Sequence, residues 1–211
     1  MPELYEQQPK LESIGLRSFL IRLHSDLFRI HNKTMTYAAY FPDHLLPIEK
    51  MVMALEDRRF MTHAGIDLKS VTRELVKALM LRRHGGASTI DMQFVRTATG
   101  YKDRTIARKV YEVLLSATIQ FRYSKIVILR SYISCAYFGS HLIGADSASA
   151  ELYGVQSVDL DFQQASVLAA MLVYPRPLSP TAEWDARVRR RAKYGMAVYV
   201  ANKKRLDKFP V

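Results

Sequence analysis

Two adjacent carboxylates, Glu56 and Asp57, are the side chains in this sequence best placed for acid–base chemistry. They close residues 48–55, where apolar side chains recur at helical spacing, so the pair lies at the end of a predicted amphipathic helix. At about 100° per residue, Glu56 falls at the edge of the apolar stripe, whereas Asp57 falls nearly opposite it and is expected to be exposed. Partial removal from water helps a carboxylate exchange protons near neutral pH, which makes Glu56 the candidate general base. The alternative is an ordinary pair of charges at a helix end.

A second group of polar residues stands at the start of another predicted helix. Ser88, Thr89 and Gln93 follow a pair of glycines at 85–86. Glycines let a ligand approach the backbone, and the free N–H groups at a helix N-terminus bind phosphate or sugar oxygens. The spacing Ser88-x-x-Asp91 is also a variant of the capping box, so a purely structural role stays open.

The clearest predicted helix covers residues 101–123, with Asp103 as its cap, and places Arg108, Lys109 and Glu112 on one face. Two cations beside a carboxylate could hold a pyrophosphate, with Glu112 orienting them or a reacting sugar. An ordinary Arg108–Glu112 surface pair is the alternative. The basic region is extended by Arg96, Lys102 and Arg104. On the opposite side, we expect a core stripe of Ile106, Val110, Val113, Leu114, Ala117 and Phe121.

Five ordered stretches resemble the signatures of glycosyltransferase family 51, the peptidoglycan glycosyltransferases found as monofunctional enzymes and as the polymerase domain of class A penicillin-binding proteins. The stretches are residues 54–67, 85–93, 108–112, 124–132 and 137–180, so the resemblance covers about residues 45–181. The sequence departs from the family's usual residues at Asp91, Met92, Arg130, Ser134, His141 and Val155.

The resemblance implies an all-α, lysozyme-like domain with two lobes. In it, Glu56 and Glu112 would lie across a cleft as the catalytic residues, and a smaller lobe would form around residues 66–100. A sugar hydroxyl of lipid II would attack the anomeric carbon of the growing lipid-linked glycan strand, and a lipid pyrophosphate would leave. No cofactor is required, although Mg²⁺ or Mn²⁺ would assist at the pyrophosphate near Glu112. The substrate-binding residues implied are Asp57, Phe60, His63, Ser88, Thr89, Gln93, Arg96, Arg104, Arg108 and Lys109.

A second class of function stays open because of the departures from the family pattern. The chain could be a catalytically weakened or inactive relative that binds lipid-linked saccharide, a membrane surface or a protein partner. Nucleic-acid binding through a basic helix over residues 184–208 is the least favoured hypothesis. The expected partners are therefore lipid II, the growing glycan strand, an anionic membrane surface and other cell-wall synthesis proteins.

The composition of the 211 residues limits these alternatives. A hydrophobic content of 49% is ample for one globular domain, and a net charge of +11 favours an anionic partner. The single cysteine, Cys135, excludes an internal disulfide bond. His63 lacks a second ligand at metal-binding spacing, and Ser88 lacks a local histidine, so neither a metal site nor a hydrolase nucleophile is indicated.

The chain divides into an N-terminal tail with a basic amphipathic helix (1–44), the family-like domain (45–181) and a basic C-terminal helix packed on the same domain (182–211). No apolar run approaches the ~20 residues that span a bilayer, and no leader opens the chain. The resemblance implies the periplasmic face of a bacterial inner membrane, so we expect a truncated, peripheral or cytoplasmic protein. Further expected elements are helices over 14–30, 68–83, 126–136, 145–153 and 161–173, an extended piece over 36–41 and a turn at 137–139.

Overall fold

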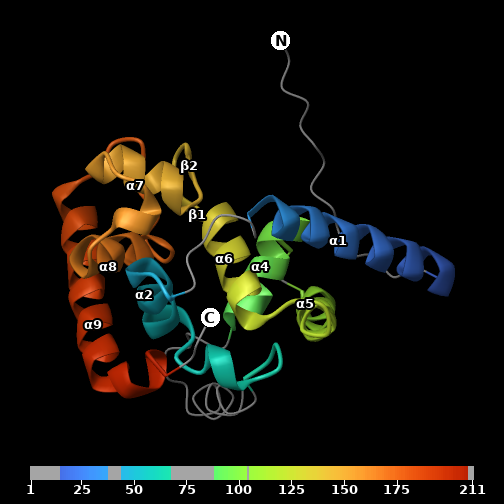
Figure 1. Cartoon of the computed structure of the whole chain (residues 1–211). Helices are drawn as coiled ribbons and strands as arrows, with labels where there is room; N and C mark the ends of the chain where they lie inside the picture. The colour runs from blue at the N-terminus through green and yellow to red at the C-terminus, as the bar shows by residue number, and fades with distance from the viewer. Residues whose placement is uncertain (1–14, 38–43, 68–87, 104, 209–211) are drawn as a thin grey trace, which may run out of the picture.

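A computed structural model describes residues 15–37, 44–67, 88–103 and 105–208 (Figure 1). These residues are mainly helical, which confirms the predicted all-α class. The expected helix over 68–83 and most of the smaller lobe lie outside the described residues. The helices are α1 (Leu16–Tyr37), α2 (Pro47–Glu56), η1 (Phe60–Thr62), α4 (Ile90–Thr99), α5 (Ile106–Ile119), α6 (Lys125–Cys135), α7 (Ala145–Tyr153), η2 (Ser157–Asp159), α8 (Phe162–Met171) and α9 (Ala182–Leu206).

The helices form two groups (Figure 1). In one group, α9 packs against α8 and α2, and α2 packs against α8. In the other group, α4 packs against α5 and α6, and α1 packs against α4 and α6. Helix α6, which is buried on nearly all sides, lies at the centre of the molecule, as its sequence predicts, and its contact with α2 joins the groups.

Two expected extended or turning segments differ from the structure. The segment at 137–139 is a strand, β1 (Tyr137–Gly139), and pairs antiparallel with β2 (Leu142–Ile143). Residues 36–37, expected to be extended, belong to the last turn of α1, and residues 38–41 lie outside the described part. The hairpin packs on α7 and α8.

The helix caps correct two expectations. Thr89, not Ser88, caps α4, and its hydroxyl accepts a hydrogen bond from the backbone N–H of Met92. Thr105, not Asp103, caps α5 in the same way. Each cap lies one or two residues later than predicted. Because Thr89 caps α4, the hydroxyl of Ser88 stays free for another contact.

The expected core stripe of α5 is wrong. Ile106 and Phe121, the ends of that stripe, are 85% and 94% exposed, and Val110 and Leu114 are also exposed. The buried face instead carries the residues Tyr111, Glu112, Leu115, Ser116 and Ile119. The helix is therefore rotated so that a carboxylate faces inward and an apolar row faces outward.

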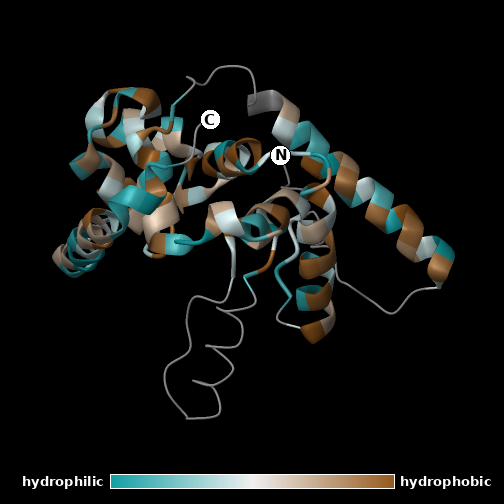
Figure 2. Ribbon diagram, turned by 60° about the horizontal axis from the view of Figure 1, so that its bottom comes forward, coloured by the Kyte–Doolittle hydropathy of each residue, from teal (hydrophilic) through white to brown (hydrophobic). Residues whose placement is uncertain are grey.

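A buried carboxylate fixes α1 against this helix. Asp26 accepts hydrogen bonds from the hydroxyls of Tyr101, at 2.9 Å, and Tyr111, at 3.0 Å. Burial, reinforced by the charge of Asp26, raises the pKa of Tyr101 to about 12, so this hydroxyl keeps its proton at neutral pH. The outward side of α1 still carries exposed Leu16, Leu20, Ile21, Phe28 and Met35, and Figure 2 shows the alternation of brown and teal along this helix.

Candidate active site

Glu56 is the last residue of α2, and both of its carboxylate oxygens are hydrogen-bonded. The amide Nε2 of Gln93 donates to Oε2 at 3.1 Å, and Nη2 of Arg191 donates to Oε1 at 2.8 Å. The hydroxyl of Tyr132 donates to the amide oxygen of Gln93 at 2.6 Å, which turns the amide nitrogen toward Glu56. Burial raises the pKa of Tyr132, so its hydroxyl remains a donor. The carboxylate is therefore held in one orientation from two helices.

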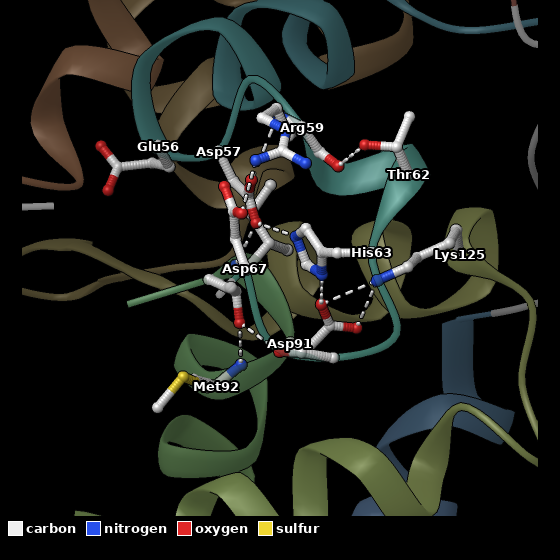
Figure 3. Close-up of polar contacts among 12 residues, drawn as sticks. Glu56, Asp57, Arg59, Thr62, His63, Asp67, Asp91, Met92 and Lys125 are labelled. Atoms are coloured by element: carbon white, nitrogen blue, oxygen red, sulfur yellow. Dashed lines mark hydrogen bonds and ion pairs between the residues drawn. The ribbon is translucent and has the colours of Figure 1, made fainter. Parts of the chain in front are cut away.

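Asp57 is buried, contrary to the expectation that it faces solvent. It is 7% exposed because α2 ends at Glu56 and the backbone of Asp57 leaves the helical conformation, so the helical projection no longer applies. Its Oδ2 accepts hydrogen bonds from Nε2 of His63 at 2.8 Å and from the backbone N–H of Ile90 at 3.3 Å. Figure 3 shows Glu56 pointing away from this contact. The adjacent carboxylates therefore serve two different sites.

His63 lies between Asp57 and a third carboxylate, Asp91 (Figure 3). Its Nδ1 is 3.9 Å from Oδ2 of Asp91, whose two oxygens also contact Nζ of Lys125 at 2.9 and 3.1 Å. Burial raises the pKa of Asp91 above 3.8, and the charge of Lys125 opposes that rise. Burial likewise lowers the pKa of Lys125, against the attraction of Asp91. Nζ of Lys125 also lies 4.3 Å from the ring centre of the fully buried Phe60.

Asp57, His63 and Asp91 are the group of described residues whose geometry could offer ligands to a metal ion, since their ligand atoms lie within 4.8 Å of one another. Lys125 already places a positive charge on both oxygens of Asp91. A metal ion would have to displace this buried ammonium. We therefore interpret the cluster as an ion-pair network that links the loop after α2 to α4 and α6.

A second cluster surrounds Glu112. This carboxylate is 2% exposed, and it accepts hydrogen bonds from Nη1 of Arg108 at 2.9 Å and from Nζ of Lys109 at 3.4 Å. Nζ of Lys109 also donates to the hydroxyl of Ser88 at 3.0 Å, which joins the second and third motifs. Burial lowers the pKa of Lys109, opposed by Glu112 and reinforced by the charges of Arg96 and Arg108. The four candidate residues Ser88, Arg108, Lys109 and Glu112 thus form one cationic cluster.

A pocket of about 400 Å³ opens beside this cluster, at the end of α4 and the start of α5. Its cationic side chains are those of Arg96, Lys102 and Arg108. The Nε atom of Arg108 is buried and has no hydrogen-bond partner among the described residues, so a donor remains available beside the pocket. The other lining residues are Thr97, Gly100, Tyr101 and Tyr137.

The loop after α2 is fixed against α4 and α5. Gly65 has a positive φ of 81°, and a Cβ atom there would lie 2.7 Å from the backbone oxygen of Ser116 in α5. The hydroxyl of Thr89 donates to the backbone oxygen of Gly65 at 2.7 Å. Only glycine allows both the turn and this close approach, so the loop position depends on it. Thr89 and Phe60, both predicted to bind substrate, are buried in this structure, and the hydroxyl of Thr89 already makes two protein hydrogen bonds.

The structure brings most of the predicted residues into three contacts: Glu56 with Gln93, Asp57 with His63, and the cluster around Glu112. Arg104 lies outside the described residues. Sequence reasoning missed Lys125, which the fourth motif contains, and Asp91, which was noted only as a departure. It also missed Arg191, which lies in a run of arginines and is distant in sequence from Glu56, so no local signal could have indicated it.

A family model described as Transglycosylase matches residues 25–199. The chain is 34% identical over 144 residues to penicillin-binding protein 2a of Streptococcus pneumoniae serotype 2, covering 68% of this chain and 19% of that protein. It is 35% identical over 167 residues to a putative transglycosylase of Cupriavidus necator, covering 76% and 71%. It is 37% identical over 141 residues to a biosynthetic peptidoglycan transglycosylase of Rhodospirillum centenum, covering 67% and 61%.

This chain spans about a fifth of the length of the penicillin-binding proteins that it matches. The family match, in contrast, extends from α1 to α9 and includes Glu56, Gln93, Glu112 and Arg191. The chain therefore belongs to the transglycosylase family and has its mainly helical, lysozyme-like fold.

Proposed function

We propose that this chain is a peptidoglycan glycosyltransferase that polymerises lipid II into glycan strands, with Glu56 as the general base. The observation that carries the proposal is the arrangement of Glu56, a family-motif carboxylate held by Gln93 and Arg191. Each carboxylate oxygen has about two acceptor positions, and among the described residues one donor contacts each oxygen, so acceptor capacity remains for a substrate hydroxyl.

The cationic cluster supports the second half of the reaction. The acceptor hydroxyl oxygen would form a bond to the anomeric carbon of the donor, its proton would pass to Glu56, and the bond from that carbon to the pyrophosphate oxygen would break. Arg108 and Lys109 would bind the departing lipid pyrophosphate, whose negative charge grows as this bond breaks. Glu112 holds both cations in place.

Mg²⁺ or Mn²⁺ at the pyrophosphate stays a prediction. Glu112 is buried, and both of its oxygens are already paired with cationic side chains, so its carboxylate is a poor ligand for a further cation. We therefore derive no step through a metal ion.

The rival hypothesis is a family member that binds lipid-linked saccharide without turnover. Two of the departures that motivate it have structural explanations. Nε of Arg130 donates to Oε1 of the buried Glu49 at 2.7 Å, and the hydroxyl of Ser134 donates to the backbone oxygen of Arg130. Neither contact involves Glu56 or Glu112, which favours the enzyme over the binding protein.

An assay with labelled lipid II tests the proposal. Wild type should produce glycan strands, and Glu56→Gln, which keeps the size of the side chain but removes the proton acceptor, should lower turnover by ~10²–10⁴-fold. This loss corresponds to ~3–5 kcal/mol of transition-state stabilisation. Glu183→Gln, at an exposed site on α9, is the matched control and should be fully active. Binding of lipid II without turnover by wild type would support the rival hypothesis.

The location of this chain at a membrane surface is also a proposal. An anionic membrane surface fits the described residues because exposed apolar side chains on α1 stand beside Arg17, Arg29 and Lys33. No described helix is long and apolar enough to cross a bilayer. We propose that α1 and the outward row of α5 rest on the membrane that contains the lipid-linked substrate, at the periplasmic face of a bacterial inner membrane. Association with other cell-wall synthesis proteins stays a prediction.

A further inference from the structure

Arg191 lies in α9, after the last stretch that resembles a family signature, and yet it contacts the candidate base. Its Nη2 is 2.8 Å from Oε1 of Glu56, and the two side chains are 22% and 11% exposed. A pair so shielded from water is screened less than a surface ion pair. α9 also carries Arg187 and Arg189, which pair with acidic residues one turn earlier on the same helix. Of these three arginines, Arg191 is the one whose ion pair reaches another helix.

A glycine in α9 makes this reach possible. A Cβ atom at Gly195, one turn after Arg191, would lie 2.9–3.1 Å from three side-chain atoms of Leu55, the residue before Glu56. Glycine in a helix interior is less favourable than alanine, so its presence here needs a packing reason. Its presence lets α9 approach the end of α2, and this approach places the guanidinium of Arg191 at the carboxylate.

The hydrogen bonding of Arg191 is incomplete for a residue that serves stability alone. Its Nε atom is buried without a hydrogen-bond partner among the described residues. A buried donor without a partner is unfavourable, which offsets part of what the ion pair contributes to folding. The contact to Glu56 is therefore better explained by what it does to that carboxylate.

We propose that Arg191 is a positioning residue for the transfer reaction: together with Gln93, it fixes the carboxylate of Glu56 in the orientation that receives the proton of the acceptor hydroxyl. This inference rests on the proposed function. Arg191 from α9 binds one oxygen and Gln93 from α4 binds the other, so rotation of the carboxylate would break one of the two contacts. Such fixed geometry lowers the barrier of a proton transfer in the same complex.

Steady-state kinetics with lipid II test the role of Arg191. Arg191→Gln should lower kcat by ~10–100-fold with little change in KM, because a misplaced base affects the reaction step and not substrate binding. Arg191→Lys keeps the charge and should recover part of kcat. Guanidinium ion, added well below denaturing concentrations, should partly restore Arg191→Ala. Arg190→Gln removes the same charge from an exposed neighbouring position and should leave kcat unchanged.

Two further variants separate positioning from folding. Gly195→Ala leaves every charge in place but pushes α9 away from Leu55, so kcat should fall while KM stays near wild type. In the Glu56→Gln background, Arg191→Gln should cause no further loss of kcat, because a residue that acts through Glu56 has no effect once the base is gone.

The outcomes are distinct. If wild type polymerises lipid II and Arg191→Gln keeps its kcat, the proposal is overturned, and a lower thermal midpoint alone would then identify a structural ion pair. A rise in KM with unchanged kcat would identify a substrate-binding residue and also overturn it. If Arg191→Gln does not fold, Arg191→Lys and Gly195→Ala carry the same test. If wild type does not polymerise lipid II, the proposed function fails, and this inference fails with it.

Discussion

Asp57 and His63 form a buried hydrogen-bonded pair: Nε2 of His63 lies 2.8 Å from Oδ2 of Asp57, and each side chain is about 5% exposed. The pair connects the C-terminus of α2 to the loop that carries Gly65. It also receives the backbone N–H of Ile90 at the start of α4. The second carboxylate of the motif therefore holds together the two segments that place Glu56 and Gln93.

We predict that Asp57→Asn destabilises the fold, in contrast to the mild effect expected of an exposed residue. The amide keeps one acceptor oxygen but presents N–H groups to donors that are already buried, which should cost about 2 kcal/mol in the free energy of unfolding. Urea unfolding measures this change. Asp159→Asn, at an exposed position in η2, is the control and should stay within about 0.5 kcal/mol of wild type. Equal stability of the two variants would contradict a structural role for Asp57.

The sequence predicted the helices far better than the faces that they bury. Apolar spacing located α6 and α7 to within a residue, because each has a uniform pattern between clear caps or glycines. Apolar spacing failed to identify the buried face of α5, because apolar residues lie on two sides of this helix. Tyr111 and Leu115 pack inward with Glu112, whereas Ile106 and Phe121 face outward. Periodicity cannot tell a core-facing stripe from one that faces another surface.

The candidate site was predictable where neighbours in sequence are also neighbours in space. Arg108, Lys109 and Glu112 are one turn apart on one helix, so their contact follows from helical geometry. Glu56 meets Arg191 and Gln93 only because the fold brings side chains from three helices to one point, and one residue after Glu56 the helix ends and redirects Asp57. These relationships depend on tertiary packing, which spacing along the chain does not encode.

Lys109→Ala should weaken the binding of a phosphoglycolipid analogue. Removal of one of the two cations at Glu112 lowers the attraction for pyrophosphate, and we expect about a tenfold loss in affinity. The thermal midpoint should change little, because Nζ of Lys109 lies at the partly exposed edge of the cluster and Arg108 still pairs with Glu112. Isothermal titration calorimetry and thermal unfolding measure the two quantities. Lys204→Ala on α9 is the control. A large loss of stability with unchanged affinity would show that Lys109 serves the fold.

Flotation with vesicles tests the proposed membrane surface. The chain should float with vesicles that contain anionic lipid, and binding should weaken in high salt because charges are screened beyond about 10 Å at 0.1 M. Leu20→Glu and Ile21→Glu place negative charges on the exposed side of α1 and should reduce binding at low salt. Val200→Glu, at an exposed apolar position of α9, is the matched control. If wild type does not bind even at low salt, the membrane proposal is wrong.

The pair of Asp91 and Lys125 gives a prediction about pH. Because burial raises the pKa of Asp91 above 3.8, the folded chain binds this proton more tightly than the unfolded chain. The contribution of Asp91 to stability is therefore largest below pH 3.8 and decreases as pH rises through the raised value. Lys125 limits this decrease because its charge favours the ionised carboxylate.

In Lys125→Met, the free energy of unfolding should therefore decrease more steeply than in wild type as the pH rises through the acidic range. At neutral pH, a buried carboxylate without its cation should cost about 3 kcal/mol, and the difference from wild type should shrink as the pH falls through the raised pKa of Asp91, where this carboxylate takes up a proton. The double variant Asp91→Thr/Lys125→Met removes both charges from the interior and should regain most of the lost stability and the shallow pH profile. Urea unfolding across this pH range measures all three proteins.

Parallel profiles for wild type and Lys125→Met would mean that Lys125 does not set the ionisation of Asp91. The ion-pair network between α4 and α6 would then be absent.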